Sequence, residues 1–185
     1  MEKQLKIVMR DYSSEQELNR LCDEIEKYIG KSPTIVELGS YMGESALIFA
    51  KRFTNGKIIC IDSWEGGFDN LDSASHADYV DVEEQFDIRM DLVNNIQKYK
   101  GLSTNFSFEC DMVYIDACHK YECVVNDIKH WLPLTKTIIS GHDYYEDEEI
   151  FKIHPHISGV STAVNECLGK PNKIFNDGSW YFLKK

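Results

Sequence analysis

Four short apolar runs in this 185-residue chain each end directly on a glycine or an aspartate, and helical patterns separate them. The runs are TIVEL at 34–38, KIICI at 57–61, DMVYI at 111–115 and TIIS at 137–140. Short runs rich in β-branched residues are typical of strands buried on both faces of a sheet. Their alternation with helices predicts a mostly parallel sheet with right-handed crossovers.

The segments between these runs carry apolar residues at helical spacing. Helices are predicted at 13–29, 44–53, 80–95, 121–132 and 160–168. Further strands are expected at 96–99, 173–175 and 180–183. The last two flank the turn Asn176-Asp177-Gly178, which favours an antiparallel hairpin. We therefore predict an α/β fold: a Rossmann-like three-layer sandwich with a mostly parallel seven-stranded sheet and an antiparallel C-terminal hairpin.

Composition limits the classes of partner. The formal net charge is −11, from 31 acidic and 20 basic residues, so the mean field repels phosphate backbones and anionic membrane surfaces. No apolar run approaches the roughly 20 residues that span a bilayer. The six cysteines are scattered, and no secretory leader is recognised before them. We expect a cytoplasmic protein with reduced thiols, no nucleic-acid partner and no membrane contact.

The length predicts one domain over residues 1–185, with 1–32 forming a helical segment packed on it. Its parallel strands would bring Gly39, Asp62, Asp116 and Asp143 to one edge of the sheet. In such sheets ligands bind beyond the carboxyl ends of the strands. The turn GSYMG at 39–43 lacks the glycines of a dinucleotide loop and the lysine of a phosphate loop, so a pyrophosphate is not the expected ligand. A carboxylate at Asp62 can instead accept the two hydroxyls of a ribose.

Four segments, taken in order, resemble the motifs of a known family. They are VELGSYMGES at 36–45, IDSWEG at 61–66, VYIDACHKYE at 113–122 and SGHDY at 140–144. Together they are similar to small class I S-adenosylmethionine-dependent methyltransferases, the group called methyltransferase family 24. The resemblance covers roughly residues 34–184 and implies S-adenosyl-L-methionine as cofactor.

The resemblance also implies roles for particular residues. Glu37 would engage the amino group of the cofactor's methionine part, directly or through water. Asp62 would hold the ribose hydroxyls, Ser103 would lie against the adenine, and Asp116 would face the methionine part and the methyl acceptor. Trp64 could wall an adenine face or belong to the core. The full set expected at the cofactor is Glu37, Gly39, Ser40, Tyr41, Gly43, Ser45, Asp62, Ser63, Trp64, Ser103 and Asp116.

Methyl transfer to oxygen or nitrogen needs in-line positioning and removal of the acceptor's proton. His119 is the first candidate for the base and His142 the second, with Asp116 beside them, although each histidine could equally be structural. Asp116 and Asp143 could also hold Mg²⁺ through oxygen ligands. The sequence has Ala117-Cys118 where the family more often has Gly-Asp, so a second carboxylate that would support a metal is missing.

These observations lead to an expected function and its alternatives. We expect methyl transfer to a small-molecule or sugar-like acceptor, at oxygen. One alternative is a catalytically inactive protein that uses the same fold to bind a ligand or partner. A nicotinamide-dependent oxidoreductase is less favoured, because the turn at 39–43 is not Gly-x-Gly-x-x-Gly. A homodimer is compatible with all three.

Overall fold

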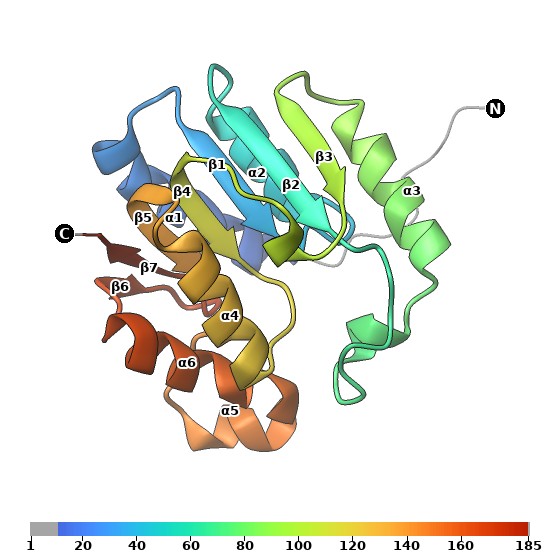
Figure 1. Cartoon of the computed structure of the whole chain (residues 1–185), viewed down its shortest axis with the longest axis vertical. Helices are drawn as coiled ribbons and strands as arrows, with labels where there is room; N and C mark the ends of the chain where they lie inside the picture. Colours follow the sequence, from blue (N-terminus) through green and yellow to red (C-terminus); the bar gives the residue numbers. More distant parts are fainter. Residues whose placement is uncertain (1–10, 185) are drawn as a thin grey trace.

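A seven-stranded sheet forms the centre of the structure, a computed structural model that describes residues 11–184 (Figure 1). The strands are β1 (Thr34–Leu38), β2 (Lys57–Asp62), β3 (Ile96–Lys100), β4 (Cys110–Ile115), β5 (Thr135–Gly141), β6 (Lys173–Ile174) and β7 (Trp180–Leu183). Their spatial order is β3-β2-β1-β4-β5-β7-β6. The neighbouring strands in the run β3-β2-β1-β4-β5 are parallel to one another, whereas β7 is antiparallel to both β5 and β6. The predicted sheet is confirmed, including its third strand and its terminal hairpin.

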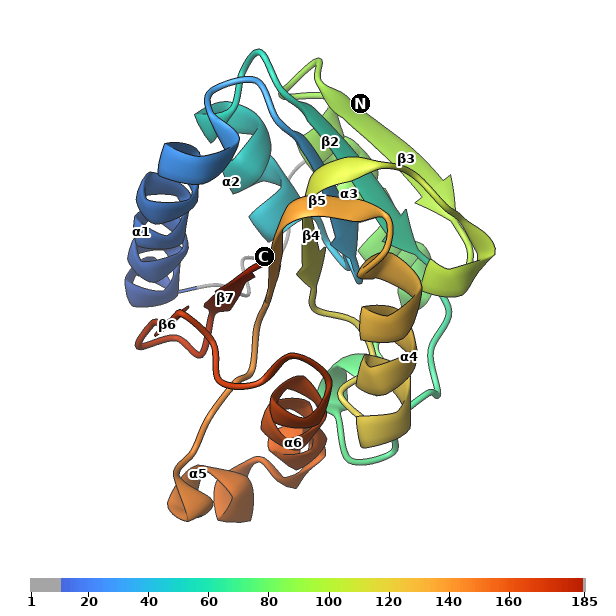
Figure 2. The ribbon, with the colours of Figure 1, turned by 60° about the vertical axis from the view of Figure 1, so that its left-hand side comes forward.

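Helices cover both faces of this sheet (Figure 2). One face carries α1 (Tyr12–Ile29), α2 (Glu44–Arg52) and α3 (Tyr79–Met90), and the other carries α4 (Tyr121–Trp131) and α6 (Ser158–Leu168). Ile35 of β1 packs in the first core and its neighbour Val36 in the second, because successive strand residues point to opposite faces. Burial on both sides explains why the strand sequences are largely apolar, with Glu37 of β1 as an exception.

The N-terminal helix α1 packs on α2 and β5. The Asp11 side chain caps it by accepting the Ser14 backbone N–H at 2.8 Å, and it ends at Gly30, whose φ is 69°. Leu18, Leu21 and Ile25, among others, form its buried stripe. The first ten residues of the predicted segment 1–32 lie outside the described residues. Within residues 11–184, no helix is long and apolar enough to cross a bilayer.

One predicted helix is too long, and one short helix was missed. The helix expected at 80–95 ends at Met90, because the following residues turn and the Asn95 side chain donates to the carbonyls of Ala50 and Phe53 before β3 begins. The short helix α5 (Glu148–Ile153) was not predicted. It buries none of its residues, so it leaves no apolar stripe to recognise. Single 3₁₀ turns also occur at Ser73–His76, Ser103–Asn105 and Pro155–Ile157.

Candidate active site

A cleft of about 640 Å³ opens at the carboxyl ends of β1, β2, β3 and β4, where the strand order reverses. It is the position at which open α/β sheets bind ligands. Most of the residues predicted at the cofactor line it: Gly39, Ser40, Tyr41, Ser45, Asp62, Ser63, Ser103 and Asp116. His119 and His142 line it too. Glu37, Gly43 and Trp64 are not among the lining residues.

The turn after β1 depends on Gly39 because of a close approach between two strand ends. Its φ is 81°, and a Cβ placed there would lie 2.1 Å from the backbone oxygen of Asp116. The glycine therefore lets the ends of β1 and β4 approach each other. Gly43, with φ 82°, is likewise confined by the ring of Phe86 at 2.9 Å.

The Asp62 carboxylate is fixed by two backbone donors. Its Oδ2 accepts the N–H of Tyr41 at 2.8 Å, and its Oδ1 accepts the N–H of Trp64 at 2.7 Å. Burial raises the pKa of Asp62, and these two hydrogen bonds oppose the shift. Each oxygen keeps a further lone pair for a ligand hydroxyl.

The Trp64 side chain packs inside the protein. Only 3% of the residue is exposed, its indole lies 4.8 Å from the ring of Phe86, and its Nε1–H donates to the carbonyl of Tyr41 at 2.9 Å. Of the two interpretations of this tryptophan, the arrangement favours the core. Its backbone N–H, which holds Asp62, is its contribution to the site.

Glu37 is a buried carboxyl directly behind the wall of the cleft. It is 0% exposed, and the Ser40 hydroxyl donates to its Oε2 at 2.5 Å. Its other oxygen has no hydrogen-bond partner among the described residues. Burial raises the pKa of this carboxyl to about 7. Ser40 lines the cleft and Glu37 does not, so the serine side chain lies between this carboxyl and the cleft.

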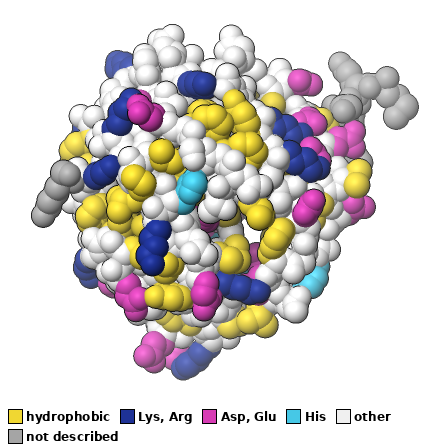
Figure 3. Space-filling view, in the orientation of Figure 1, with side chains coloured by type: hydrophobic (Ala, Val, Ile, Leu, Met, Phe, Trp, Pro, Cys, Tyr) yellow, Lys and Arg dark blue, Asp and Glu magenta, His cyan; other side chains and the backbone are white. Residues whose placement is uncertain are grey.

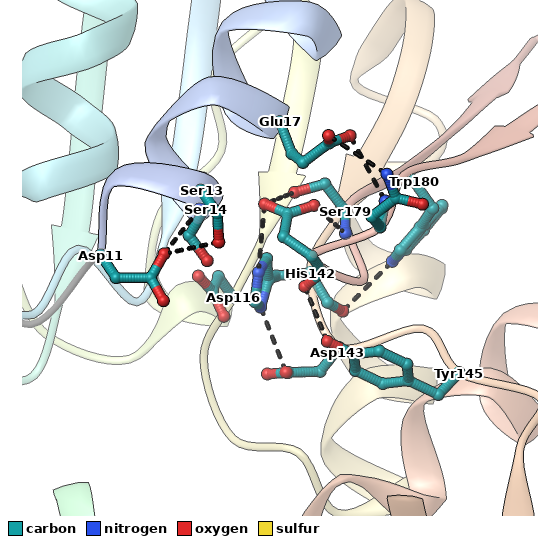
Figure 4. Close-up of polar contacts among 12 residues, drawn as sticks. Asp11, Ser13, Ser14, Glu17, Asp116, His142, Asp143, Tyr145, Ser179 and Trp180 are labelled. Atoms are coloured by element: carbon teal, nitrogen blue, oxygen red, sulfur yellow. Dashed lines mark hydrogen bonds and ion pairs between the residues drawn. The ribbon is translucent and has the colours of Figure 1, made fainter.

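Two imidazoles share one carboxylate at the ends of β4 and β5. His119 Nε2 lies 2.9 Å from Asp143 Oδ2, and His142 Nδ1 lies 3.1 Å from Asp143 Oδ1. Asp116 Oδ1 is 3.7 Å from His119 Nε2. Figure 4 shows Asp116, His142 and Asp143 gathered at this point, with Tyr145 beside them. The structure thus brings together all the residues predicted as catalytic.

The nitrogen of each imidazole that does not contact Asp143 also faces a carboxylate. Asp72 Oδ2 lies 3.6 Å from His119 Nδ1, and Asp177 Oδ2 lies 3.6 Å from His142 Nε2. Burial disfavours charge on His119, but the carboxylates of Asp116, Asp143 and Asp72 outweigh it and raise the pKa of His119 well above its usual value. The pKa of His142 is raised to about 10 against the same opposition from burial. The carboxylates around both rings therefore favour their charged, imidazolium form.

The same contacts argue against the predicted Mg²⁺ site. Asp116, His142 and Asp143 offer ligand atoms within 4.8 Å of one another. However, an imidazole occupies each oxygen of Asp143, and one of the three groups offers nitrogen. Mg²⁺ prefers an octahedral shell of oxygens. The residues do not fit this ion, so no step is assigned to it.

Sequence reasoning missed three acidic residues of the site. Asp72 lies in the loop before α3, and Asp177 lies in the turn between β6 and β7, so neither is near the histidines in sequence. Asp127 lies on α4, lines the cleft, and accepts a hydrogen bond from the Ser103 hydroxyl. Only Asp127 had a sequence signal: it interrupts the apolar stripe of its helix, which includes Val124.

The chain matches one family model and resembles several solved structures. A family described as "Methyltransferase domain" has a model that matches residues 36–144. Among curated proteins, none matches. Similar solved structures include a provisionally named caffeoyl-CoA O-methyltransferase from Staphylococcus aureus, with 17% identity, a TM-score of 0.64, and coverage of 98% of this chain and 86% of that one.

Two other structures share the fold. A provisionally named rRNA methylase from Clostridium thermocellum has 15% identity and a TM-score of 0.53, over 95% of this chain and 97% of that chain. CalO1, a methyltransferase in calicheamicin biosynthesis solved with SAH bound, has 10% identity and a TM-score of 0.57, over 93% of this chain and 55% of that chain. At these identities the likeness establishes the fold.

Proposed function

The chain belongs to the methyltransferase domain family whose model it matches, and from this premise we propose that it transfers a methyl group from S-adenosylmethionine to oxygen of a small-molecule acceptor. The observation that carries the proposal is the Asp62 carboxylate, held by two backbone N–H groups at the wall of the cleft. A carboxylate oriented in this way suits the paired hydroxyls of a ribose.

Other residues of the cleft fit the remaining parts of this cofactor. Glu37 keeps a buried oxygen without a hydrogen-bond partner among the described residues, and Ser40 connects this carboxyl to the cleft. An ammonium group bound at Ser40 would supply the opposite charge that the buried carboxyl lacks. When bound, S-adenosylmethionine supplies an electrophilic methyl group on a sulfonium.

Asp116 and His119 are the side chains assigned to the acceptor. The surrounding carboxylates raise the pKa of His119 and so favour a ring that donates, and we assign it the role of donating a hydrogen bond to the acceptor oxygen. The acceptor's proton would then pass to the Asp116 carboxylate, whose Oδ1 lies 3.7 Å from His119 Nε2. His142, held between Asp143 and Asp177, fixes the orientation of the carboxylate that His119 contacts.

The charge of the cleft favours a small acceptor without phosphate groups. Its described lining includes Glu65, Asp69 and Asp72 but no lysine or arginine. On the face drawn in Figure 3, acidic and basic side chains are interspersed and form no continuous basic patch. The net charge of −11 also disfavours an acceptor that carries phosphate groups. We therefore prefer a small molecule over RNA, although an rRNA methylase has the same fold.

Isothermal titration with S-adenosylmethionine and S-adenosylhomocysteine tests the proposal. Binding of both is expected, and binding of neither would contradict it. A panel of hydroxylated and amine-bearing acceptors then separates an enzyme from the inactive binding protein, since cofactor binding without any methyl transfer would favour the latter. For an acceptor that reacts, His119→Ala should lower kcat about a hundredfold or more while leaving S-adenosylhomocysteine affinity nearly unchanged.

A further inference from the structure

Asp69 is a buried carboxylate in the lining of the cleft to which the proposed chemistry gives no role. Only 5% of the residue is exposed. Its Oδ1 accepts the backbone N–H of Leu71 at 3.0 Å, and within residues 11–184 this is the only hydrogen bond that its carboxylate makes. Oδ2 is therefore an acceptor at the cleft that still lacks a donor.

The carboxylate of Asp69 also lacks a cation. In the described part of the chain it forms no ion pair, and the lining of the cleft there contains no lysine or arginine. His119 and His142 line the cleft, but the carboxylates that each of them contacts belong to other residues. Removing a carboxylate from water without an opposite charge is costly. A side chain of this kind in a cleft points to a cation that arrives with a ligand.

Two contacts place Asp69 at the acceptor end of the cleft. The loop between β2 and α3 runs to the residues that precede α4 (Figure 2). There the Lys120 side chain donates to the backbone oxygen of Phe68, and Asp72 Oδ2 lies 3.6 Å from His119 Nδ1. Asp69 follows Phe68 directly, and its backbone oxygen accepts the N–H of Asp72 at 3.3 Å. The loop thus holds Asp69 near the imidazole assigned to the acceptor.

We propose that Oδ2 of Asp69 binds an ammonium group of the methyl acceptor, so that the acceptors of this protein are small hydroxylated amines. The inference rests on the proposed function and adds to it the class of acceptor and a residue that selects it. An ammonium supplies both the missing donor and the missing charge, and hydrogen bonds between charged groups are roughly twice as strong as neutral ones. Because a protonated amine has no free lone pair, the hydroxyl remains the group that accepts the methyl.

Isothermal titration into protein saturated with S-adenosylhomocysteine tests this contact. The ligands are two matched pairs: D-glucosamine with D-glucose, in which a hydroxyl replaces the amine, and tyramine with 4-ethylphenol, which lacks the amine. The first pair represents sugar-like acceptors and the second aromatic ones. Each ligand is titrated into the wild type and two variants, Asp69→Asn and Glu65→Gln.

The two variants separate a specific contact from the general field of the cleft. Asp69→Asn keeps Oδ1 for the N–H of Leu71 but removes the charge and turns Oδ2 into a donor. Glu65→Gln removes an equal charge from an exposed residue of the same lining. Only the first variant should abolish discrimination between an amine and its neutral partner.

In the wild type, the amine of at least one pair should bind about tenfold tighter than its partner, or more. Asp69→Asn should bind the two members of that pair within about threefold of each other, whereas Glu65→Gln should keep most of the preference. The affinity for S-adenosylhomocysteine itself should be the same in the wild type and in Asp69→Asn.

Four results would overturn the assignment. They are preference for neither amine in the wild type, a preference that persists in Asp69→Asn, an equal loss of preference in both variants, and a loss of S-adenosylhomocysteine affinity in Asp69→Asn, which would assign the carboxylate to the cofactor. The first of these needs no variant to fold. Failure of the wild type to bind S-adenosylhomocysteine would instead remove the proposed function.

Discussion

His119 Nε2 lies 2.9 Å from Asp143 Oδ2, and this contact joins the loop after β4 to the end of β5. The other oxygen of the same carboxylate holds His142, so one aspartate positions two imidazoles. Asp143 adopts φ 60°, a left-handed conformation that is unfavourable for a residue with a side chain. The contacts with the two rings offset this cost and stabilise the site in one arrangement.

Asp143→Asn should therefore destabilise the protein strongly. The substitution removes the carboxylate charge between two imidazoles that are 15% and 17% exposed, and removing one partner of a fully buried ion pair costs about 3 to 5 kcal/mol, which is the upper bound here. Urea unfolding monitored by circular dichroism would measure the loss. Asp91→Asn, at an exposed position after α3, is the control and should change stability by less than about 0.5 kcal/mol. Equal stability of the two variants would show that the network does not hold the fold.

Asp62→Ala should weaken the binding of S-adenosylhomocysteine about tenfold or more. The variant leaves the backbone N–H groups of Tyr41 and Trp64 without their acceptor and the ribose without its own. Isothermal titration measures the change, with Asp87→Ala as an exposed control. An unchanged affinity would mean that the ribose lies elsewhere.

Gly39→Ala and Gly169→Ala form a matched pair. Both glycines have positive φ, 81° and 84°, so both variants carry a backbone cost, about 1 to 3 kcal/mol at Gly169, whose ψ of −171° lies in a region that other residues rarely adopt. Only at Gly39 would the new Cβ meet a backbone oxygen, at 2.1 Å, whereas at Gly169 nothing lies within 4 Å. Gly39→Ala should lose about 2 kcal/mol more in urea unfolding, or fail to fold. Equal losses would contradict the close approach of β1 and β4.

Glu37 should make stability depend on pH. Its pKa is raised from 4.5 to about 7 in the folded protein, so folding favours the protonated carboxyl. This contribution is present below about pH 4.5 and is lost as the pH rises through 7, a change on the order of 3 kcal/mol. Glu37→Gln cannot ionise and should gain this amount relative to the wild type between pH 4.5 and 8. The measurement is urea unfolding across that range, with exposed Glu122→Gln as control. Parallel profiles for wild type and Glu37→Gln would refute the shift.

Millimolar Mg²⁺ should leave the melting temperature unchanged. Both oxygens of Asp143 are already held by imidazoles, and displacing them would separate opposite charges in a buried site. Differential scanning calorimetry with and without the ion provides the measurement, and EDTA serves as the reference condition. A rise of several degrees with Mg²⁺ would show that Asp116 and Asp143 bind it after all.

The sequence by itself determined the order of the elements and the residues at the ends of the strands. A strand buried on both faces is largely apolar, so the glycine or aspartate that follows the apolar run marks its end, and this local signal places Gly39, Asp62 and Asp116 at one edge. Only the tertiary structure decided which side chains meet there. The paths of the loops bring Asp72 to His119 and Asp177 to His142, and helix packing turns Trp64 inward and Asp127 toward the cleft. Such contacts join residues far apart in sequence, and no periodicity along the chain records them.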